Sequence, residues 1–177
     1  PLLAPLELTI GAEERIGADG AVVRDLDEDK FRADLKVLHD RGEVEALTIC
    51  FINAYINGEH ERRARDIAAE IFTDVPISIS SEVVPEMQEY ERTETTVVNS
   101  YVRPEVAKYV KNLQAALETR MGDDTQLSIL RSDGGLASAR GAAVSPVNLL
   151  MSGAAGGVSG AIYFCSRAGF DNILTFD

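Results

Sequence analysis

The stretch that decides the fold runs from residue 152 to residue 177 and reads SGAAGGVSGA (152–161), IYFCSRAG (162–169) and FDNILTFD (170–177). Ser152 is a typical helix N-cap and Gly169 a typical residue just beyond a helix, so the sequence predicts one helix between them. The apolar run at 173–176 predicts a buried strand that follows this helix and ends at the carboxylate of Asp177.

The predicted helix contains glycines that helix propensity alone disfavours. Each glycine in a helix interior costs roughly 1 kcal/mol relative to alanine. The small residues recur at three- and four-residue steps and therefore share one face: Gly153, Gly156, Gly157, Gly160 and Ala161. A bare face of this kind lets another backbone or a ligand approach closely.

Upstream of this stretch, buried strands alternate with an amphipathic helix. The runs at 46–51 and 75–80 are apolar, as in the strands of parallel sheets. The segment between them carries Ala64, Ile67 and Ala68 at helical spacing. This order predicts an α/β fold with a parallel or mixed sheet and flanking helices.

The first forty residues predict three further elements. Segment 6–10 and Val22-Val23 predict two strands of a hairpin-like pair. A helix follows, with Asp25 or Asp27 as its N-cap and Gly42 as its stop.

A long helical stretch is predicted at 98–117. Pro104 lacks a backbone N–H, so we expect a break or kink near 101–103. Tyr101 and Tyr109 recur with the apolar residues at helical spacing, and we expect both in the core.

The polar run that leads into this helix is the first candidate site. It contains Glu91, Arg92, Thr93 and Asn99. Charged groups that become partly buried need partners, so this run could line a cleft and contact a substrate or another domain. The alternative is a capping and salt-bridge network.

A strand at 126–130, a tight turn at 132–135 and a short helix at 136–140 are predicted next. Asp133 lies at the carboxyl end of that strand, where ligands often bind. Turn chemistry explains the Asp-Gly-Gly sequence equally well.

His60 and the two cysteines are interpreted as structural residues. His60 lies on the inner side of the helix that carries Ala64, where a buried structural histidine is expected rather than a general base. Cys50 and Cys165 are expected to be free, buried thiols.

Composition excludes some classes of function. Acidic residues outnumber basic ones by 29 to 17, and the net charge of −12 argues against a nucleic-acid surface. No apolar run is long enough for a membrane span and no signal peptide opens the chain, so we expect no membrane association and a cytoplasmic protein. Walker, HExxH, paired CxxC and GxSxG motifs are absent, so the sequence contains no complete catalytic site.

Several of these segments match motifs of one family. The sequence resembles the hydantoinase A/5-oxoprolinase family, which includes the ATP-using subunits of acetone and acetophenone carboxylases. Members carry QSNGGL, SGPAGGVxGA and ITFDMGGTSTD motifs. The matching segments here are RSDGGL (131–136), SGAAGGVSGA (152–161), LTFD (174–177), SSEVVPE (80–86), EYERT (89–93) and TVVNSYV (96–102).

Two differences from the family pattern are visible. Ala154 stands where members usually have proline. The glycine-rich phosphate loop that members carry after the aspartate is expected beyond Asp177, so we expect the sequence to be an internal fragment of a longer protein.

The resemblance implies a fragment of an actin-like (ribonuclease H-like) ATPase fold. Residues 1–126 would be an α/β subdomain inserted in the first lobe. Residues 127–177 would be the end of that lobe, the helix that crosses between lobes and the first strand of the second phosphate-binding hairpin.

The function implied by the resemblance is that of an ATP-dependent cyclic-amide hydrolase subunit of the hydantoin, N-methylhydantoin or 5-oxoproline type. Such an enzyme would activate the amide by phosphorylation with ATP and Mg²⁺ and would work with a hydantoinase B-type partner. The alternatives are the ATP-using subunit of an acetone- or acetophenone-type carboxylase and a non-catalytic interaction module. The fragment alone is not expected to be active.

The implied site residues follow from the matched motifs. Asp177 would lie on the phosphate-loop and Mg²⁺ side of the nucleotide. The residues expected at the nucleotide or between lobes are Ser152, Gly153, Gly156 and Gly157. The candidates for substrate or cleft contacts are Glu91, Arg92, Asn99 and Asp133.

Overall fold

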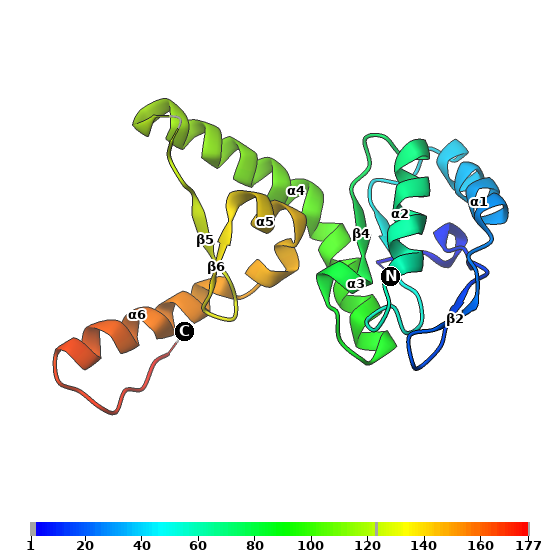
Figure 1. The fold of residues 1–177 in the computed structure, drawn as a ribbon. Helices are drawn as coiled ribbons and strands as arrows, with labels where there is room; N and C mark the ends of the chain where they lie inside the picture. The colour runs from blue at the N-terminus through cyan, green and yellow to red at the C-terminus, as the bar shows by residue number, and fades with distance from the viewer. Residues whose placement is uncertain (1–2, 123, 177) are drawn as a thin grey trace. The chain divides into compact units, whose positions relative to one another are not determined.

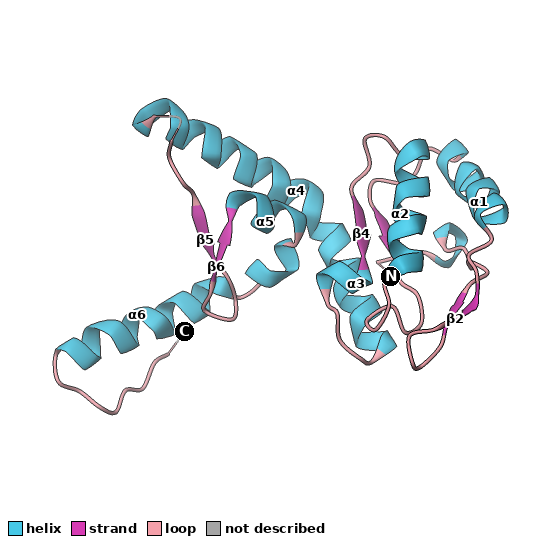
Figure 2. Ribbon diagram, viewed as in Figure 1, coloured by secondary structure: helices cyan, strands magenta, loops and turns pink. Residues whose placement is uncertain are grey.

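The computed structural model describes residues 3–122 and 124–176 and contains two compact units. Unit 1 ends at Pro104 and unit 2 begins at Glu105, so the boundary falls inside helix α4 (Glu89–Met121). Figure 1 shows the order of the elements along the chain, and Figure 2 shows their types. The sequence-based division into residues 1–126 and 127–177 refers to the parts of a longer family member rather than to these two units, and it stays a prediction.

Unit 1 is built on a small parallel sheet. Strands β3 (Leu47–Ile49) and β4 (Ile77–Ile79) pair in parallel, with Leu47 opposite Ile77. Helix α2 (Glu59–Ile71) connects them, as the sequence predicts. A parallel pair needs such a crossover, because its strands run in the same direction. The α/β class and the parallel sheet are confirmed.

Helices α1 (Glu28–Asp40) and α2 pack against each other in unit 1 (Figure 1). The N-cap of α1 is Asp27, whose side chain accepts a hydrogen bond from Lys30 N–H (3.0 Å). Gly42 follows the helix with φ +69°, a conformation that glycine adopts without steric cost. Both predicted ends of α1 are confirmed.

The core of unit 1 lies between these helices and one face of the sheet. It consists of ten buried hydrophobic residues: Leu26, Phe31, Leu35, Leu38, Ile49, Ala64, Ile67, Ala68, Phe72 and Ile79. The odd-numbered strand residues therefore face α1 and α2, and the even-numbered residues face the opposite side.

The start of the chain differs from the prediction. Leu6–Leu8 forms a 3-10 turn, η1, rather than a strand, because Pro5 has the fixed φ that begins a turn and Leu8 N–H bonds to its carbonyl (3.0 Å). The hairpin is instead made by β1 (Arg15–Ile16) and β2 (Val22–Arg24), which pair antiparallel.

Helix α4 runs through Pro104 without a break, and the kink that was the alternative stays a prediction. One lost backbone hydrogen bond does not end a helix that tertiary contacts support, and Arg103 provides such a contact through Nη1, which donates to Ile77 C=O (2.5 Å). Tyr101 and Tyr109 are 67% and 65% exposed in the structure, so the prediction that they lie in the core is wrong.

The second half of α4 is followed in unit 2 by an antiparallel pair of strands. Strands β5 (Ser128–Leu130) and β6 (Leu136–Ser138) flank the predicted turn, in which Gly134 has φ +81°. The helix predicted at 136–140 starts later, as α5 (Ala139–Val144). The reason is that Ser138 ends β6 and caps α5 by accepting a hydrogen bond from Gly141 N–H (3.1 Å).

A 3-10 turn, η2 (Pro146–Leu149), leads to helix α6 (Ser152–Arg167). Ser152 is the first helical residue rather than the N-cap. Met151 holds the N-cap position with φ +65°, and no side chain caps the helix. Gly169, with φ +83°, follows the helix end as predicted.

The strand predicted at 173–176 is not formed. These residues are exposed, and no strand in the described part of the chain lies beside them. A strand needs a neighbour that pairs with its backbone groups, so the apolar run alone does not create one. Asp177 lies outside the described residues. None of the helices within 3–122 and 124–176 is long and apolar enough to cross a membrane.

Two glycines of α6 have different surroundings. A Cβ atom added at Gly156 would lie 2.7 Å from Leu130 Cδ2 of β5, closer than packed side chains allow. A Cβ atom added at Gly160 would have no heavy atom within 4 Å in the described part of the chain. The absence of a side chain at Gly156 therefore lets Leu130 approach α6 closely, whereas no described residue approaches the helix in this way at Gly160.

This difference predicts different effects of the same substitution. Gly160→Ala should raise the free energy of unfolding by up to about 1 kcal/mol through helix propensity. Gly156→Ala should give less of this gain or none, because the Leu130 side chain must move away from the added Cβ. Urea titration of both variants measures the effects. In a Leu130→Ala background, Gly156→Ala should regain the propensity benefit. Equal stabilisation by both alanines in the wild-type background would contradict the packing role of Gly156.

Candidate functional site

The second face of the unit 1 sheet is covered by the first half of α4 through polar contacts. Polar residues recur on α4 at steps of three and four, which places them on one face: Arg92, Thr96, Asn99, Ser100 and Arg103. The first four are at most 4% exposed. The sheet presents small polar side chains at the matching alternate positions: Thr48, Cys50, Ser78 and Ser80.

Several side-chain contacts join α4 to the sheet, and four of them form a regular series. Two involve β3 and the residue after it: Thr48 Oγ1 donates to Ser100 Oγ (2.7 Å), and Cys50 Sγ lies 2.8 Å from Thr93 Oγ1. The other two involve β4 and the residue after it: Asn99 Nδ2 donates to Ser78 Oγ (3.1 Å), and Arg92 Nε donates to Ser80 Oγ (3.2 Å). We call these four contacts the polar ladder.

Glu61 of α2 lies at the carboxyl ends of both strands and is completely buried. One carboxylate oxygen accepts hydrogen bonds from Phe51 N–H (2.8 Å) and from the Ser80 hydroxyl (2.6 Å). The other accepts from Ser81 N–H (2.7 Å). A buried carboxylate is stable only when its charge is compensated in this way.

Arg92 provides the opposite charge and is 1% exposed. Besides Ser80, its guanidinium donates to Phe51 C=O (2.9 Å) and to Glu86 C=O (2.9 Å), and it lies 5.5 Å from the ring centroid of Tyr55. Glu61 and Arg92 thus share Ser80 and the peptide groups of Phe51. We call these two residues and their partners the Glu61–Arg92 cluster.

The sequence contains a signal for the burial of Glu61. Glu61 stands three residues before Ala64 and seven before Ala68, on the buried face of α2. The neighbouring residues Arg63 and Arg65 instead form ion pairs at the surface. Arg63 makes a two-point ion pair with Glu28, and this hydrogen bonding lowers the pKa of Glu28.

His60 is buried, as expected of a structural histidine, and the structure supplies the partner that the sequence leaves open. Its Nδ1 lies 2.8 Å from Glu14 Oε2, and both side chains are less than 10% exposed. This contact holds the segment before β1 against α2.

Both cysteines are free, as expected, but they are only half-buried, so the expectation that both are buried is wrong.

Arg103 is partly buried as well. Burial lowers the pKa of its guanidinium, and the charge of Glu82 opposes that shift.

The candidate residues Arg92 and Asn99 lie together in the interface between α4 and the sheet, whereas Glu91 is exposed. The geometry of Arg92 and Asn99 matches an internal hydrogen-bonded network. Their contact with a substrate stays a prediction, as does that of Glu91.

The remaining candidates lie in unit 2. Asp133 is exposed, pairs with Arg131 (2.6 Å) and accepts a hydrogen bond from Gly135 N–H (2.9 Å), so turn chemistry accounts for its position. The residues Ser152, Gly153, Gly156 and Gly157 lie at the start of α6, and their contact with a nucleotide or another lobe stays a prediction. The turn does approach α6, since a Cβ atom at Gly134 would lie 3.7 Å from Ser159 Oγ.

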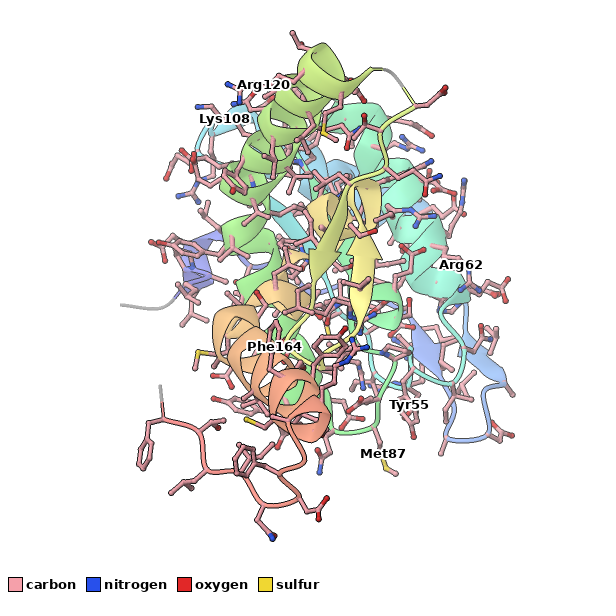
Figure 3. All side chains as sticks on the ribbon, turned by 90° about the vertical axis from the view of Figure 1, so that its left-hand side faces the viewer. Tyr55, Arg62, Met87, Lys108, Arg120 and Phe164 are labelled. Atoms are coloured by element: carbon pink, nitrogen blue, oxygen red, sulfur yellow. The ribbon has the colours of Figure 1, made fainter. Side chains whose placement is uncertain are left out.

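The surface of α6 exposes several large apolar side chains, and Arg167 at its end is its one charged residue. No residue of α6 is buried. Its exposed side chains include Ile162, Tyr163 and Phe164, which is labelled in Figure 3 and is 71% exposed. Within 3–122 and 124–176, no group of three or more His, Cys, Asp and Glu residues is placed to hold a metal ion.

The family comparison agrees with the motifs. Residues 2–72 match the sequence model of the hydantoinase/oxoprolinase N-terminal region, and residues 92–177 match that of hydantoinase/oxoprolinase. Together these matches span most of the chain. The chain belongs to the hydantoinase/oxoprolinase family.

Individual relatives cover nearly the whole chain. Caprolactamase subunit alpha of Pseudomonas jessenii is 31% identical over 99% of this chain and 25% of its own length. The 5-oxoprolinase of Saccharomyces cerevisiae is 36% identical over 78% of this chain and 10% of its own length. Among solved structures, nucleotide-free acetone carboxylase is 30% identical over 97% of this chain and 24% of its own, with a TM-score of 0.84. The chain therefore spans about a quarter or less of these relatives.

The Glu61–Arg92 cluster predicts a large effect of a small change. Glu61→Gln removes the charge that balances Arg92 and turns an amide NH₂ toward backbone donors, so the free energy of unfolding should fall by about 2–4 kcal/mol. The control is Glu59→Gln, an exposed position on the same helix, which should change it by less than about 0.5 kcal/mol. Urea unfolding followed by circular dichroism measures both. Equal stability of the two variants would show that the cluster does not hold unit 1 together.

Proposed function

We propose that this chain is part of an ATP-dependent cyclic-amide hydrolase subunit of the hydantoin, N-methylhydantoin or 5-oxoproline type. The observation that supports the proposal most directly is the likeness to caprolactamase subunit alpha over 99% of this chain. A structure of ATP-dependent caprolactamase from the same organism has a TM-score of 0.75 to this chain at 30% identity. Caprolactam and 5-oxoproline are both cyclic amides, so these relatives share a chemical class of substrate.

The fold that we propose for the longer protein is actin-like. Residues 1–126 would belong to an inserted subdomain of the first lobe, and α6 would be the helix that crosses between lobes. The bare glycines of α6 support this role, because a crossing helix must allow close approach along its length.

In this proposal the phosphate groups of ATP lie at the start of α6. No side chain caps this helix, so the N–H groups of its first turn remain available to an anion. Cβ atoms added at Gly153 and Gly157 would meet no heavy atom within 4 Å in the described part of the chain, which leaves room for a phosphate group. The described residues do not by themselves fit Mg²⁺, since they hold no acidic cluster.

The chemistry that ATP supplies in such an enzyme is a phosphoryl group for the amide oxygen, which opens the ring carbon to attack by water. In this proposal the first-turn N–H groups of α6 bind and orient phosphate oxygens, and Gly153 and Gly157 keep side chains out of their way. Asp177, which lies outside the described residues, would act on the Mg²⁺ side of the site.

The proposed enzyme works with a second subunit of the hydantoinase B type. The relatives named as subunits support this, since caprolactamase subunit alpha and the acetone carboxylase beta subunit of Xanthobacter autotrophicus both belong to multi-subunit enzymes. Its need for ATP is consistent with a cytoplasmic location.

One observation favours a second candidate, the ATP-using subunit of an acetone- or acetophenone-type carboxylase. The TM-score to acetone carboxylase is 0.84, higher than the 0.75 to caprolactamase, at the same 30% identity. Both candidates transfer a phosphoryl group, so positioning and electrostatics would provide most of the rate in either.

Turnover assays on the longer polypeptide that contains this sequence, with its partner subunit, distinguish the candidates. With Mg-ATP we expect phosphate release in step with ring opening of hydantoin, 5-oxoproline or caprolactam. The 177-residue chain alone should release no phosphate above the blank. Phosphate release that depends on acetone or acetophenone with bicarbonate, and not on any cyclic amide, would instead establish the carboxylase.

The role of the α6 start predicts a specific kinetic effect. Gly153→Leu in the longer polypeptide should raise the KM for ATP by about tenfold or more, because the side chain fills the space left for phosphate. Gly11→Leu is the matched control, since a Cβ atom there also meets no heavy atom within 4 Å among the described residues. It should leave the KM unchanged. An unchanged KM in Gly153→Leu would remove α6 from the nucleotide site without affecting the choice of substrate class.

A further inference from the structure

The sheet of unit 1 has one unpaired edge. Leu47 N–H donates to Pro76 C=O (2.9 Å), which fixes the edge of β3 that faces β4. Backbone groups of successive strand residues point to opposite edges, so those of Ala46, Thr48 and Cys50 point away from β4. In the described part of the chain, β4 is the only strand paired with β3.

A cleft of about 650 Å³ runs along this unpaired edge, entirely within unit 1. Its floor is the continuous segment 43–51, which contains β3. One wall comes from α1 and includes Leu35 and Leu38, and another comes from α4 and includes Val97 and Ser100. Residues of the segment 3–12 also line the cleft. Among the described residues, those that line the cleft include none from α2 or β4.

These walls place the cleft in the layer of the sheet itself. Helix α1 covers the face of β3 that carries Leu47 and Ile49, and α4 covers the face that carries Thr48. The cleft therefore lies beside β3 with a helix layer on each side. That is the place where the next strand of the same sheet would lie, about 4.8 Å from β3.

A helix or a compact ligand fits this place less well than a strand. A helix is about 10–12 Å wide with its side chains and satisfies its own backbone groups, so it would leave the edge of β3 unpaired. An extended segment pairs those groups and fits between two helix layers.

We propose that the cleft binds a further β-strand, which pairs with β3 and comes from the same polypeptide outside the present sequence. The relatives support this source. The acetone carboxylase structure matches 97% of this chain with only 24% of its own, so most of that polypeptide lies outside the matched part. This proposal does not depend on which reaction the protein catalyses.

The existing strands indicate what sequence the added strand must have. Large aliphatic residues face α1 and α2, and small polar residues face α4, as in Leu47-Thr48-Ile49-Cys50 and Ile77-Ser78-Ile79-Ser80. The small residues leave room for the polar ladder. The added strand should therefore alternate a large aliphatic residue with a serine, threonine, cysteine, alanine or glycine over four to six positions.

Hydrogen exchange at single amides tests the proposal, with the 177-residue chain compared with the full-length polypeptide. The Thr48 and Cys50 amides should exchange quickly in the 177-residue chain and at least about a hundredfold more slowly in the full-length polypeptide. The Leu47 and Phe51 amides are internal controls, because their hydrogen bonds to Pro76 and Glu61 exist within the present sequence. Their protection should change much less.

Three outcomes would overturn the proposal. Thr48 and Cys50 amides that exchange equally fast in both proteins would show that no strand is added. Protection that appears in the 177-residue chain as its concentration rises would identify a second copy as the occupant. Protection of the full-length polypeptide only after the partner subunit is added would assign the strand to that subunit.

Discussion

Unit 1 depends on one completely buried carboxylate, that of Glu61. Its hydrogen-bond donors come from the residue Phe51 beyond β3 and from Ser80 and Ser81 directly after β4. Arg92 contacts the ends of the same two strands through Ser80 Oγ and Phe51 C=O. Because an uncompensated buried charge costs several kcal/mol, the donors must all be in place when the chain folds. Arg92, near the beginning of α4, also binds Ser80 and so attaches α4 to these strand ends.

The polar ladder gives the second face of the sheet a different character from the first. The first face packs α1 and α2 through aliphatic side chains, which tolerate small shifts. The second face joins α4 through directional contacts such as Thr48 to Ser100 and Ser78 to Asn99. A shift of α4 by one residue would leave these groups unpaired inside the protein. The ladder therefore defines the register of α4 on the sheet more strictly than apolar packing would.

The sequence predicts those parts of the structure that local signals determine. Asp27 and Gly42 define α1, and the spacing of Ala64, Ile67 and Ala68 defines the buried face of α2. The same reasoning fails where burial depends on a distant partner. Tyr101 and Tyr109 match an apolar helical pattern, yet both are exposed, and the face of α4 that covers the sheet is a polar one.

Predictions of the candidate site from the sequence fail for the same reason, because its contacts involve distant parts of the chain. Arg92 and Asn99 are recognisable as unusual polar residues, but their partners Ser78 and Ser80 come from another strand, and no local pattern connects them. The apolar run at 173–176 illustrates the reverse case, since a strand signal without a neighbouring strand leaves an exposed segment. The prediction that Ser152 is the N-cap of α6 is wrong for a local reason, because Met151 adopts a positive φ and takes the N-cap position.

The uncharged surface of α6 has a consequence for how the protein behaves in solution. Nearly all of the net charge of −12 is carried by residues before 105, and no charged residue lies between Ser152 and Ser166. Electrostatic repulsion between molecules therefore protects unit 1 far better than α6. At about 0.1 M salt this repulsion extends only about 10 Å. Resistance to aggregation will then depend on low ionic strength or on a partner that covers α6. A change of pH will not provide that resistance if it leaves α6 uncharged.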